Sequence, residues 1–215
     1  MSTGESAPGK RLNAMLSGIG LAPLDPALTC RFEEYLSLFV RWNERVNLTS
    51  VRDEDSILLR HFVESIACAR ALPEGISTLL DFGSGGGFPG IPIALCRPEI
   101  LVTLAESQGK KAAFLQEAVR VLGISASVHA GRAQLLQMSF DCVTLRAVDK
   151  MAAAVKAGAD LVAPGGWLAL MTTRSDLAEL QAAAGAVFSW TGADLLPGGE
   201  DRVLALGQRA VSSLV

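Results

Sequence analysis

The sequence predicts an α/β fold with one mostly parallel, doubly wound sheet, on the strength of two observations. From residue 77 onward, short apolar runs alternate with stretches of helical periodicity, which is typical of strands connected by helices. The residues before that point show helical spacing alone. We therefore expect a disordered leader rich in Ser and Gly over residues 1–10, a helical extension over 11–75 and the α/β core over 76–215.

The individual elements follow from spacing and from helix-breaking residues. Apolar residues recur at helical intervals from Pro26 to Val46 and again from about Glu54, until Pro73–Gly75 ends the second stretch. Further helices are expected before Gly123, over 148–162 and over 176–184. Seven strands are expected at 77–82, 100–105, 124–130, 140–145, 167–171, 186–192 and 202–207. Together they predict a Rossmann-like, seven-stranded sheet with helices on both faces.

Composition limits the functional classes. The chain has 215 residues, half of them apolar, and a formal charge of −3, with no basic tail for passive nucleic-acid binding. Its four cysteines are far apart and form no C-x-x-C pair, so we expect buried thiols and no metal site. No apolar run approaches the length of a membrane span. These features predict a cytoplasmic protein, monomeric and with no membrane partner.

A glycine-rich loop follows the first strand of the core. It reads Asp81-Phe82-Gly83-Ser84-Gly85-Gly86-Gly87-Phe88-Pro89-Gly90 and lies where α/β sheets hold nucleotides. Gly83, Gly85 and Gly87 would let the backbone approach a ligand. A dinucleotide loop needs a glycine where Phe88 stands, which disfavours a nucleotide-dependent oxidoreductase. The preceding Asp81 instead suits the ammonium group of S-adenosylmethionine, which its carboxylate can orient directly or through water.

Two later segments extend this cofactor prediction. Glu106 ends the second strand, where a carboxylate can accept both ribose hydroxyls of an adenosine; a solvated acid is the alternative. After the third strand, the loop containing Ala133 and Gln134 would border the adenine. The sequence thus predicts S-adenosylmethionine as cofactor and S-adenosylhomocysteine as product.

The fourth strand constrains which atom is methylated. It ends Thr144-Leu145-Arg146 and lacks the D/N-P-P-Y motif used on exocyclic amines. Cys142 lies inside the strand, so the nucleophile needed for a pyrimidine carbon is missing. A ring nitrogen with a free lone pair requires neither device. Arg146 is the candidate catalytic residue at this edge, with an ion pair to Asp149 or Asp81 as the structural alternative.

Several of these segments together resemble the RsmG (GidB) family of bacterial 16S rRNA methyltransferases. The resemblance is carried by Trp42-Asn43, Asn47-Leu48-Thr49-Ser50-Val51-Arg52, Arg60-His61, Ser65 and Phe88-Pro89-Gly90-Ile91-Pro92. It implies a class I S-adenosylmethionine-dependent fold and methylation of a guanine N7 in 16S rRNA or the small ribosomal subunit. It also implies that Gly83, Phe88, Ala133, Gln134 and Arg146 bind the cofactor, and that Glu106 with Ser107 holds the ribose.

This chain departs from the family at a few positions. Glu64 and Glu106 stand where the family often has Asp, and both keep the carboxylate. The fifth strand ends Met171-Thr172-Thr173-Arg174, whereas the family often has Lys-Gly. The role of that lysine is therefore in doubt here, and Arg174 could supply the charge from a shifted position.

The RNA surface is a separate expectation. Six cations could form a local basic surface, although charged residues on helices are often only solvated: Arg41, Arg45, Arg52, Arg60, Lys110 and Lys111. We expect His61 to serve in packing and hydrogen bonding, and Phe32, Phe39 and Trp42 to belong to the core. Two alternative functions remain open at this stage: a methyltransferase for another RNA or a small molecule, and a non-catalytic RNA-binding protein that keeps the cofactor pocket.

Overall fold

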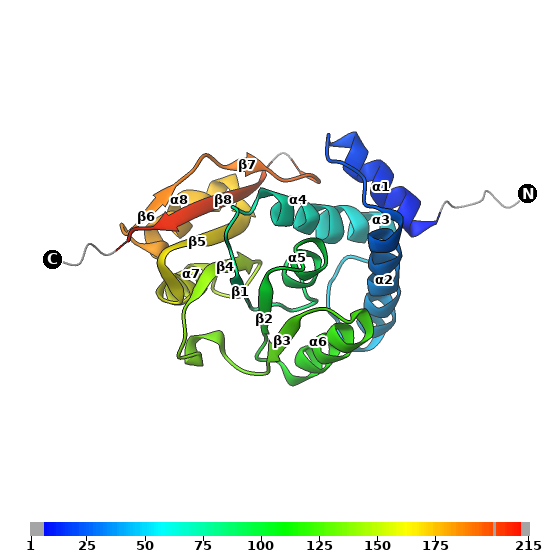
Figure 1. Ribbon diagram of the computed structural model, residues 1–215, viewed down its shortest axis with the longest axis horizontal. Coiled ribbons are helices and arrows are strands. Elements are labelled where there is room, and N and C mark those ends of the chain that lie inside the picture. Colours follow the sequence, from blue (N-terminus) through cyan, green and yellow to red (C-terminus); the bar gives the residue numbers. More distant parts are fainter. Residues whose placement is uncertain (1–6, 200, 212–215) are drawn as a thin grey trace, which may run out of the picture.

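A single mixed sheet forms the centre of the molecule. The computed structural model describes residues 7–199 and 201–211. Seven strands lie in the order β3-β2-β1-β4-β5-β8-β6, and β7 pairs with β8 beside this path (Figure 1). The first five strands are parallel, while β8 runs antiparallel to β5 and β6 antiparallel to β8. The strands are β1 Thr78–Phe82, β2 Leu101–Ala105, β3 Ala126–His129, β4 Phe140–Arg146, β5 Val162–Thr173, β6 Phe188–Trp190, β7 Asp194–Leu195 and β8 Arg202–Arg209. The Rossmann-like seven-stranded prediction is confirmed.

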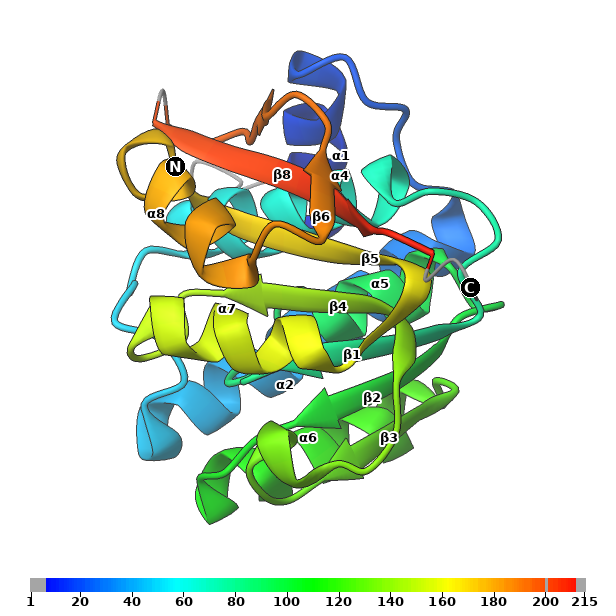
Figure 2. The same cartoon turned by 90° about the vertical axis from the view of Figure 1, so that its left-hand side faces the viewer.

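Helices cover both faces, as predicted. In Figure 2, α7 and α8 lie in front of the sheet and the N-terminal helices lie behind it. The helices of the core are α5 Gly90–Cys96, α6 Gly109–Leu122, the short η2 Ala133–Leu135, α7 Met151–Asp160 and α8 Arg174–Ala184. The alternation of β1 divides the interior into two cores. Leu79 packs in the cluster that includes α5 and α6, whereas Leu80 and Phe82 pack with α7 and α8.

The N-terminal extension is helical throughout. Its elements are α1 Pro8–Gly18, α2 Pro26–Val46, α3 Glu54–Ile57, the π-helix η1 Leu58–Val63 and α4 Glu64–Ala71. Asp25 caps α2 by accepting a hydrogen bond from Leu28 N, Pro26 occupies its first turn, and Asn47 ends it in the left-handed conformation. The two predicted helical stretches are confirmed, with the second divided among α3, η1 and α4.

Some predicted boundaries need correction. The expected leader, residues 1–10, falls partly outside the described residues, but α1 already begins at Pro8. Proline fits the first turn of a helix, and Gly9 N is held by the Glu33 carboxylate at 2.8 Å. β5 begins at Val162, so Pro164 and its two following glycines lie within an irregular part of the strand instead of a turn before it.

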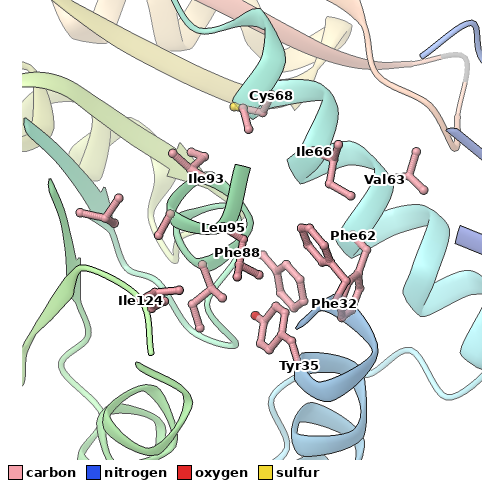
Figure 3. Close-up of a cluster of buried hydrophobic side chains, with 14 of the residues drawn as sticks. Phe32, Tyr35, Phe62, Val63, Ile66, Cys68, Phe88, Ile93, Leu95 and Ile124 are labelled. Carbon is pink, nitrogen blue, oxygen red and sulfur yellow. The ribbon is translucent and has the colours of Figure 1, made fainter. Parts of the chain in front are cut away.

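Aromatic rings join the extension to the core. Phe88, directly after the glycine loop, lies 5.2–5.3 Å from the rings of Tyr35, Phe39 and Phe62. Figure 3 shows Phe32, Tyr35, Phe62 and Phe88 gathered between α2, α4 and α5. This packing makes the extension one wall of the region around the loop, and it buries Phe32 and Phe39 as expected.

Three expectations about absences and cysteines can be compared with the structure. In residues 7–199 and 201–211 no helix is long and apolar enough to cross a membrane. The same ranges contain no cluster of three or more His, Cys, Asp or Glu side chains suited to a metal ion. The expectation of four buried thiols is wrong for Cys30, which is exposed on α2, and Cys96 is only half-buried.

Candidate functional site

A pocket of about 520 Å³ opens at the carboxyl ends of β1, β2 and β4, where the glycine loop, Glu106 and Arg146 meet. Parallel sheets bind their ligands at this edge, beyond the ends of the strands. The extension supplies the opposite wall. Its lining residues are Phe39, Leu48, Thr49, Ser50, Val51, Arg60 and His61. The pocket is therefore built jointly by the α/β core and the helical extension.

The glycine loop leaves space on its pocket side. Gly83, Gly85 and Gly87 all have positive φ, at 76°, 54° and 87°. A Cβ on Gly87 would meet Ile91 Cδ1 at 2.5 Å, so this glycine is required by packing. A Cβ on Gly85 would meet no atom closer than 3.9 Å. Gly85 thus lines an open volume that a side chain would occupy.

Glu106 fixes the loop against the second strand. Its side chain is 7% exposed and lines the pocket. One carboxylate oxygen accepts from Gly85 N at 2.9 Å and the other from Gln108 N at 2.7 Å. Each oxygen keeps a free lone pair, so the carboxylate could also accept hydroxyl groups of a ligand. The neighbouring Ser107 is exposed and lines the same pocket.

Asp81 lies outside this pocket. Its carboxylate accepts from Thr144 Oγ1 at 2.9 Å and Gly90 N at 3.2 Å, and it is fully buried. Burial raises the pKa of Asp81 to about 6, although the hydrogen bonds that its carboxylate accepts lower the pKa. The reason is strand alternation, since Asp81 shares the α5 side of β1 with Leu79. Asp81 therefore anchors the loop from beneath, and a contact with an ammonium group, direct or through water, stays a prediction.

The predicted adenine segment borders a second, adjoining hollow. This hollow has a volume of about 310 Å³ and is lined by Ala133 and Gln134. It shares Gly83, Ser107 and Val148 with the larger pocket, so the two volumes are neighbours along the sheet edge. The structure thus brings the candidate cofactor residues other than Asp81 and Gly87 to one continuous rim.

Arg146 belongs to a buried cluster of charges. Its guanidinium lies 3.1 Å from the Glu64 carboxylate, and Arg202 contacts the same carboxylate at 2.7 and 3.0 Å. Glu64 is completely buried and the Arg146 side chain is 8% exposed. The partner of Arg146 is thus Glu64, and the alternative pairing with Asp149 or Asp81 is wrong. Nε of Arg146 is buried without a hydrogen-bond partner among the described residues.

His61 connects this cluster to the extension. Its Nδ1 lies 3.1 Å from an Arg146 amino group and its Nε2 lies 2.9 Å from Thr49 Oγ1. Because a guanidinium only donates, Nδ1 must accept, and Nε2 carries the proton toward Thr49. Burial, followed by the nearby Arg146, lowers the pKa of His61 to about 3. His61 is therefore a neutral ring, stacked 5.1 Å from Phe88.

Sequence reasoning missed the roles of Glu64 and Arg202. One signal was available for Glu64: it lies three residues after His61, on the same helical face, within an otherwise apolar stretch. An acid on an apolar helix face is rarely buried without a partner. Nothing comparable indicated Arg202, which reaches the cluster from β8 at the far end of the chain.

Comparison with known proteins shows the family of the chain. Residues 29–195 match the family described as rRNA small subunit methyltransferase G (GidB). The chain belongs to this family. The protein of that name from Xanthomonas euvesicatoria is 42% identical over 161 residues, which cover 74% of this chain and 75% of its own. The one from Stenotrophomonas maltophilia is 42% identical over 171 residues, covering 77% and 80%. The predicted family, and with it a small-subunit rRNA methyltransferase, is confirmed.

Solved structures share the family's fold at low identity. The pyocyanin biosynthetic protein PhzM superposes with a TM-score of 0.62 at 14% identity, over 80% of this chain and 62% of its own. A putative O-methyltransferase from Klebsiella pneumoniae gives 0.58 at 14% identity, over 94% and 99%. These likenesses establish the class I methyltransferase fold alone.

The cations expected to contact rRNA fall into separate groups. Arg60 and Lys111 line the main pocket, together with Arg146 and Arg202. Arg52 is exposed and donates to Asn47 Oδ1 at 3.3 Å. The remaining three surround a different hollow, between α2 and α6: Arg41, Arg45 and Lys110. The six predicted residues therefore line two hollows and the exposed segment after α2.

Proposed function

We propose that this chain transfers a methyl group from S-adenosylmethionine to N7 of a guanine in 16S rRNA, in free form or in the small ribosomal subunit. The assignment to N7 rests on His61, whose ring is neutral and hydrogen-bonded at both nitrogens. It is the one histidine in the described lining of the pocket, and Arg146 and Thr49 occupy both of its ring nitrogens. A neutral histidine held in this way is not free to remove a proton.

Guanine N7 is a target that needs no such base. Its lone pair is available for attack, so no proton has to leave before the methyl group is transferred. The described pocket lining includes no cysteine either, and Cys142 is completely buried in β4 with a pKa raised by burial. These features favour a ring nitrogen over an exocyclic amine or a pyrimidine carbon.

The pocket fits S-adenosylmethionine, because the space beside Gly85 is open and Glu106 faces it with unused lone pairs. S-adenosylmethionine would supply an activated methyl group and leave as S-adenosylhomocysteine. Glu106 would hold the ribose hydroxyls, and Ala133 and Gln134 would border the adenine. Arg146 would contribute its positive charge to the lining of the pocket. Positioning of this kind is what the protein contributes to such a transfer.

Mass spectrometry of 16S rRNA nucleosides tests the proposal. Cells with the gene should carry one more 7-methylguanosine per 16S rRNA than deletion cells, and the wild-type gene should restore it. The Gly85→Val variant should not, because its side chain fills the cofactor space. An unchanged 7-methylguanosine content, or the loss of a methyl group at another atom, would refute the assignment to N7.

A further inference from the structure

A third hollow, separate from the cofactor pocket and from the hollow beside Ala133 and Gln134, is lined by side chains that the methyl transfer does not use. It measures about 530 Å³ and lies between α2 and α6, which lie next to each other in Figure 1. Its lining includes the indole of Trp42 and three cations, Arg41, Arg45 and Lys110. An aromatic ring among cations is the combination with which proteins bind single nucleotides of RNA, the ring taking the base and the cations the phosphate.

The indole is held in place before any ligand arrives. Trp42 Nε1 lies 3.2 Å from a Glu117 carboxylate oxygen on α6. Its ring meets Phe114 edge-to-face, with centroids 5.8 Å apart. Trp42 is nevertheless only half-buried, so part of the ring remains available, and the expectation that it is a core residue holds only in part. A fixed ring loses little conformational freedom when a base packs against it.

The charges around the ring are unbalanced. Glu117 is the one acid in the described lining, and Arg41 already lies 3.3 Å from it. Arg45 and Lys110 are exposed and form no ion pair within residues 7–199 and 201–211. Three cations against one carboxylate give a local excess of positive charge on a chain whose total is −3. Such a local excess attracts phosphate.

The hollow also adjoins the cofactor pocket along the chain. Lys110 lines the hollow and the next residue, Lys111, lines the pocket, both in the first turn of α6. On the α2 side, Val46 lines the hollow and Leu48 lines the pocket. A polynucleotide with one base in the pocket could therefore reach the hollow with a neighbouring nucleotide.

We propose that this hollow binds one nucleotide of the RNA substrate near the methylated guanine, with its base against Trp42 and its phosphate between Arg45 and Lys110. The inference depends on the proposed function, since it assumes an RNA substrate. An acidic segment of a ribosomal protein would satisfy the cations but would leave the aromatic ring unused, which is why RNA is favoured.

Two variants test the hollow without touching the cofactor pocket. Arg45→Glu/Lys110→Glu should raise KM for small subunits at least tenfold and reduce the dependence of log kcat/KM on log salt by about 0.7 for each phosphate that is no longer bound. Trp42→Leu keeps an apolar side chain against Phe114 and should raise KM at least fivefold. A matched control, Arg120→Glu/Lys156→Glu, reverses two exposed cations outside the hollow and should leave KM within twofold. Calorimetry should give unchanged cofactor affinity in all three.

The outcomes separate the two proposals. A wild-type protein that binds S-adenosylmethionine but methylates no 16S rRNA would refute the proposed function. If both variants methylate small subunits with the KM and the salt dependence of the wild type, the proposal that the hollow binds a nucleotide is refuted and the proposed function is not. Ultraviolet crosslinking of the wild-type protein to small subunits identifies the occupant: we expect a nucleotide on the peptide that contains Trp42, and a ribosomal protein there instead would overturn the proposal.

Discussion

Replacing Glu64 with glutamine should destabilise the protein and weaken cofactor binding together. Glu64 is completely buried and accepts three hydrogen bonds, of 2.7 to 3.1 Å, from Arg146 and Arg202. The glutamine keeps the shape and one acceptor oxygen but removes the only acid in direct contact with the two guanidinium groups among the described residues. Arginine does not lose its proton in proteins, so both positive charges would remain.

The size of the effect follows from burial. Three charge-assisted hydrogen bonds at about 1.5–3 kcal/mol each would sum to about 4.5–9 kcal/mol if they were additive. They share one carboxylate and glutamine retains part of them, so the cost of breaking a buried ion pair, about 3–5 kcal/mol, is the better figure. Domains have a total stability of about 5–15 kcal/mol, so the variant still folds unless the wild type lies at the low end of that range.

Urea unfolding followed by circular dichroism, with calorimetry for S-adenosylmethionine, measures both effects. We expect Glu64→Gln to lower the free energy of unfolding by about 3–5 kcal/mol. We expect the affinity to fall by about tenfold, because a displaced Arg146 would lose about one charge-assisted hydrogen bond to the cofactor, worth about 1.5 kcal/mol. Glu64→Asp keeps the charge and should lose less of both. As a control, Glu99→Gln removes an exposed partner of Arg97, and that surface ion pair should contribute less than about 1 kcal/mol.

Two results would refute this reasoning. A Glu64→Gln variant that unfolds within about 0.5 kcal/mol of wild type, like an ordinary surface substitution, would mean that the buried cluster contributes no net stability. A variant that is destabilised as expected but binds the cofactor with wild-type affinity would restrict Glu64 to a structural role and leave Arg146 correctly placed without it.

Three further predictions concern the pocket. Gly85→Val should abolish S-adenosylmethionine binding in a folded protein, because the open space beside Gly85 is filled; calorimetry showing unchanged affinity would contradict this. Glu106→Gln should reduce the affinity for S-adenosylmethionine about tenfold or more, since hydrogen bonds to charged groups contribute about 1.5–3 kcal/mol. An affinity within twofold of wild type would mean that Glu106 only anchors the loop. The pKa of His61 lies at about 3 in the folded protein and at 6.5 when exposed, so only the unfolded chain binds the proton between these values. The contribution of His61 to stability should therefore fall on acidification below about pH 6.5, by up to about 1.4 kcal/mol per pH unit, while Asp81, whose pKa is raised to about 6 in the folded protein, contributes in the opposite direction. When the free energy of unfolding is measured by urea at several pH values, His61→Gln should lose the part of its pH dependence that comes from His61, and His129→Gln should keep it. If the two variants show the same pH dependence, His61 is not a buried neutral ring.

The parts of the site that the sequence predicts well are those set by local chain geometry. The glycine loop and Glu106 each follow directly from the end of a strand, and neighbouring parallel strands bring such ends to one edge. Asp81 shows the limit of this reasoning. Its position in the loop motif suggested a ligand contact, but strand alternation turns its side chain toward α5, and only the register of the strand determines that.

Long-range partners could not be predicted in the same way. Arg146 lies 82 residues from Glu64, and Arg202 lies 138 residues from it, so their meeting depends on how the extension packs against the sheet. The small elements escaped prediction for a different reason. β7 has two residues, too few for any periodic pattern, and α1 begins among glycine and polar residues that resemble a disordered leader in composition.

The extension is better understood as part of the catalytic domain than as an appended module. α2 holds the glycine loop directly, since the Tyr35 hydroxyl donates to Gly86 O at 2.6 Å and a Cβ on Gly86 would meet the Phe39 ring at 2.7 Å. Two turns further along, the same helix carries Trp42 and Arg45 to the proposed nucleotide hollow. One helix therefore contacts both the glycine loop and the proposed nucleotide hollow, so the distance between the two is set by the helix itself and does not depend on a flexible linker.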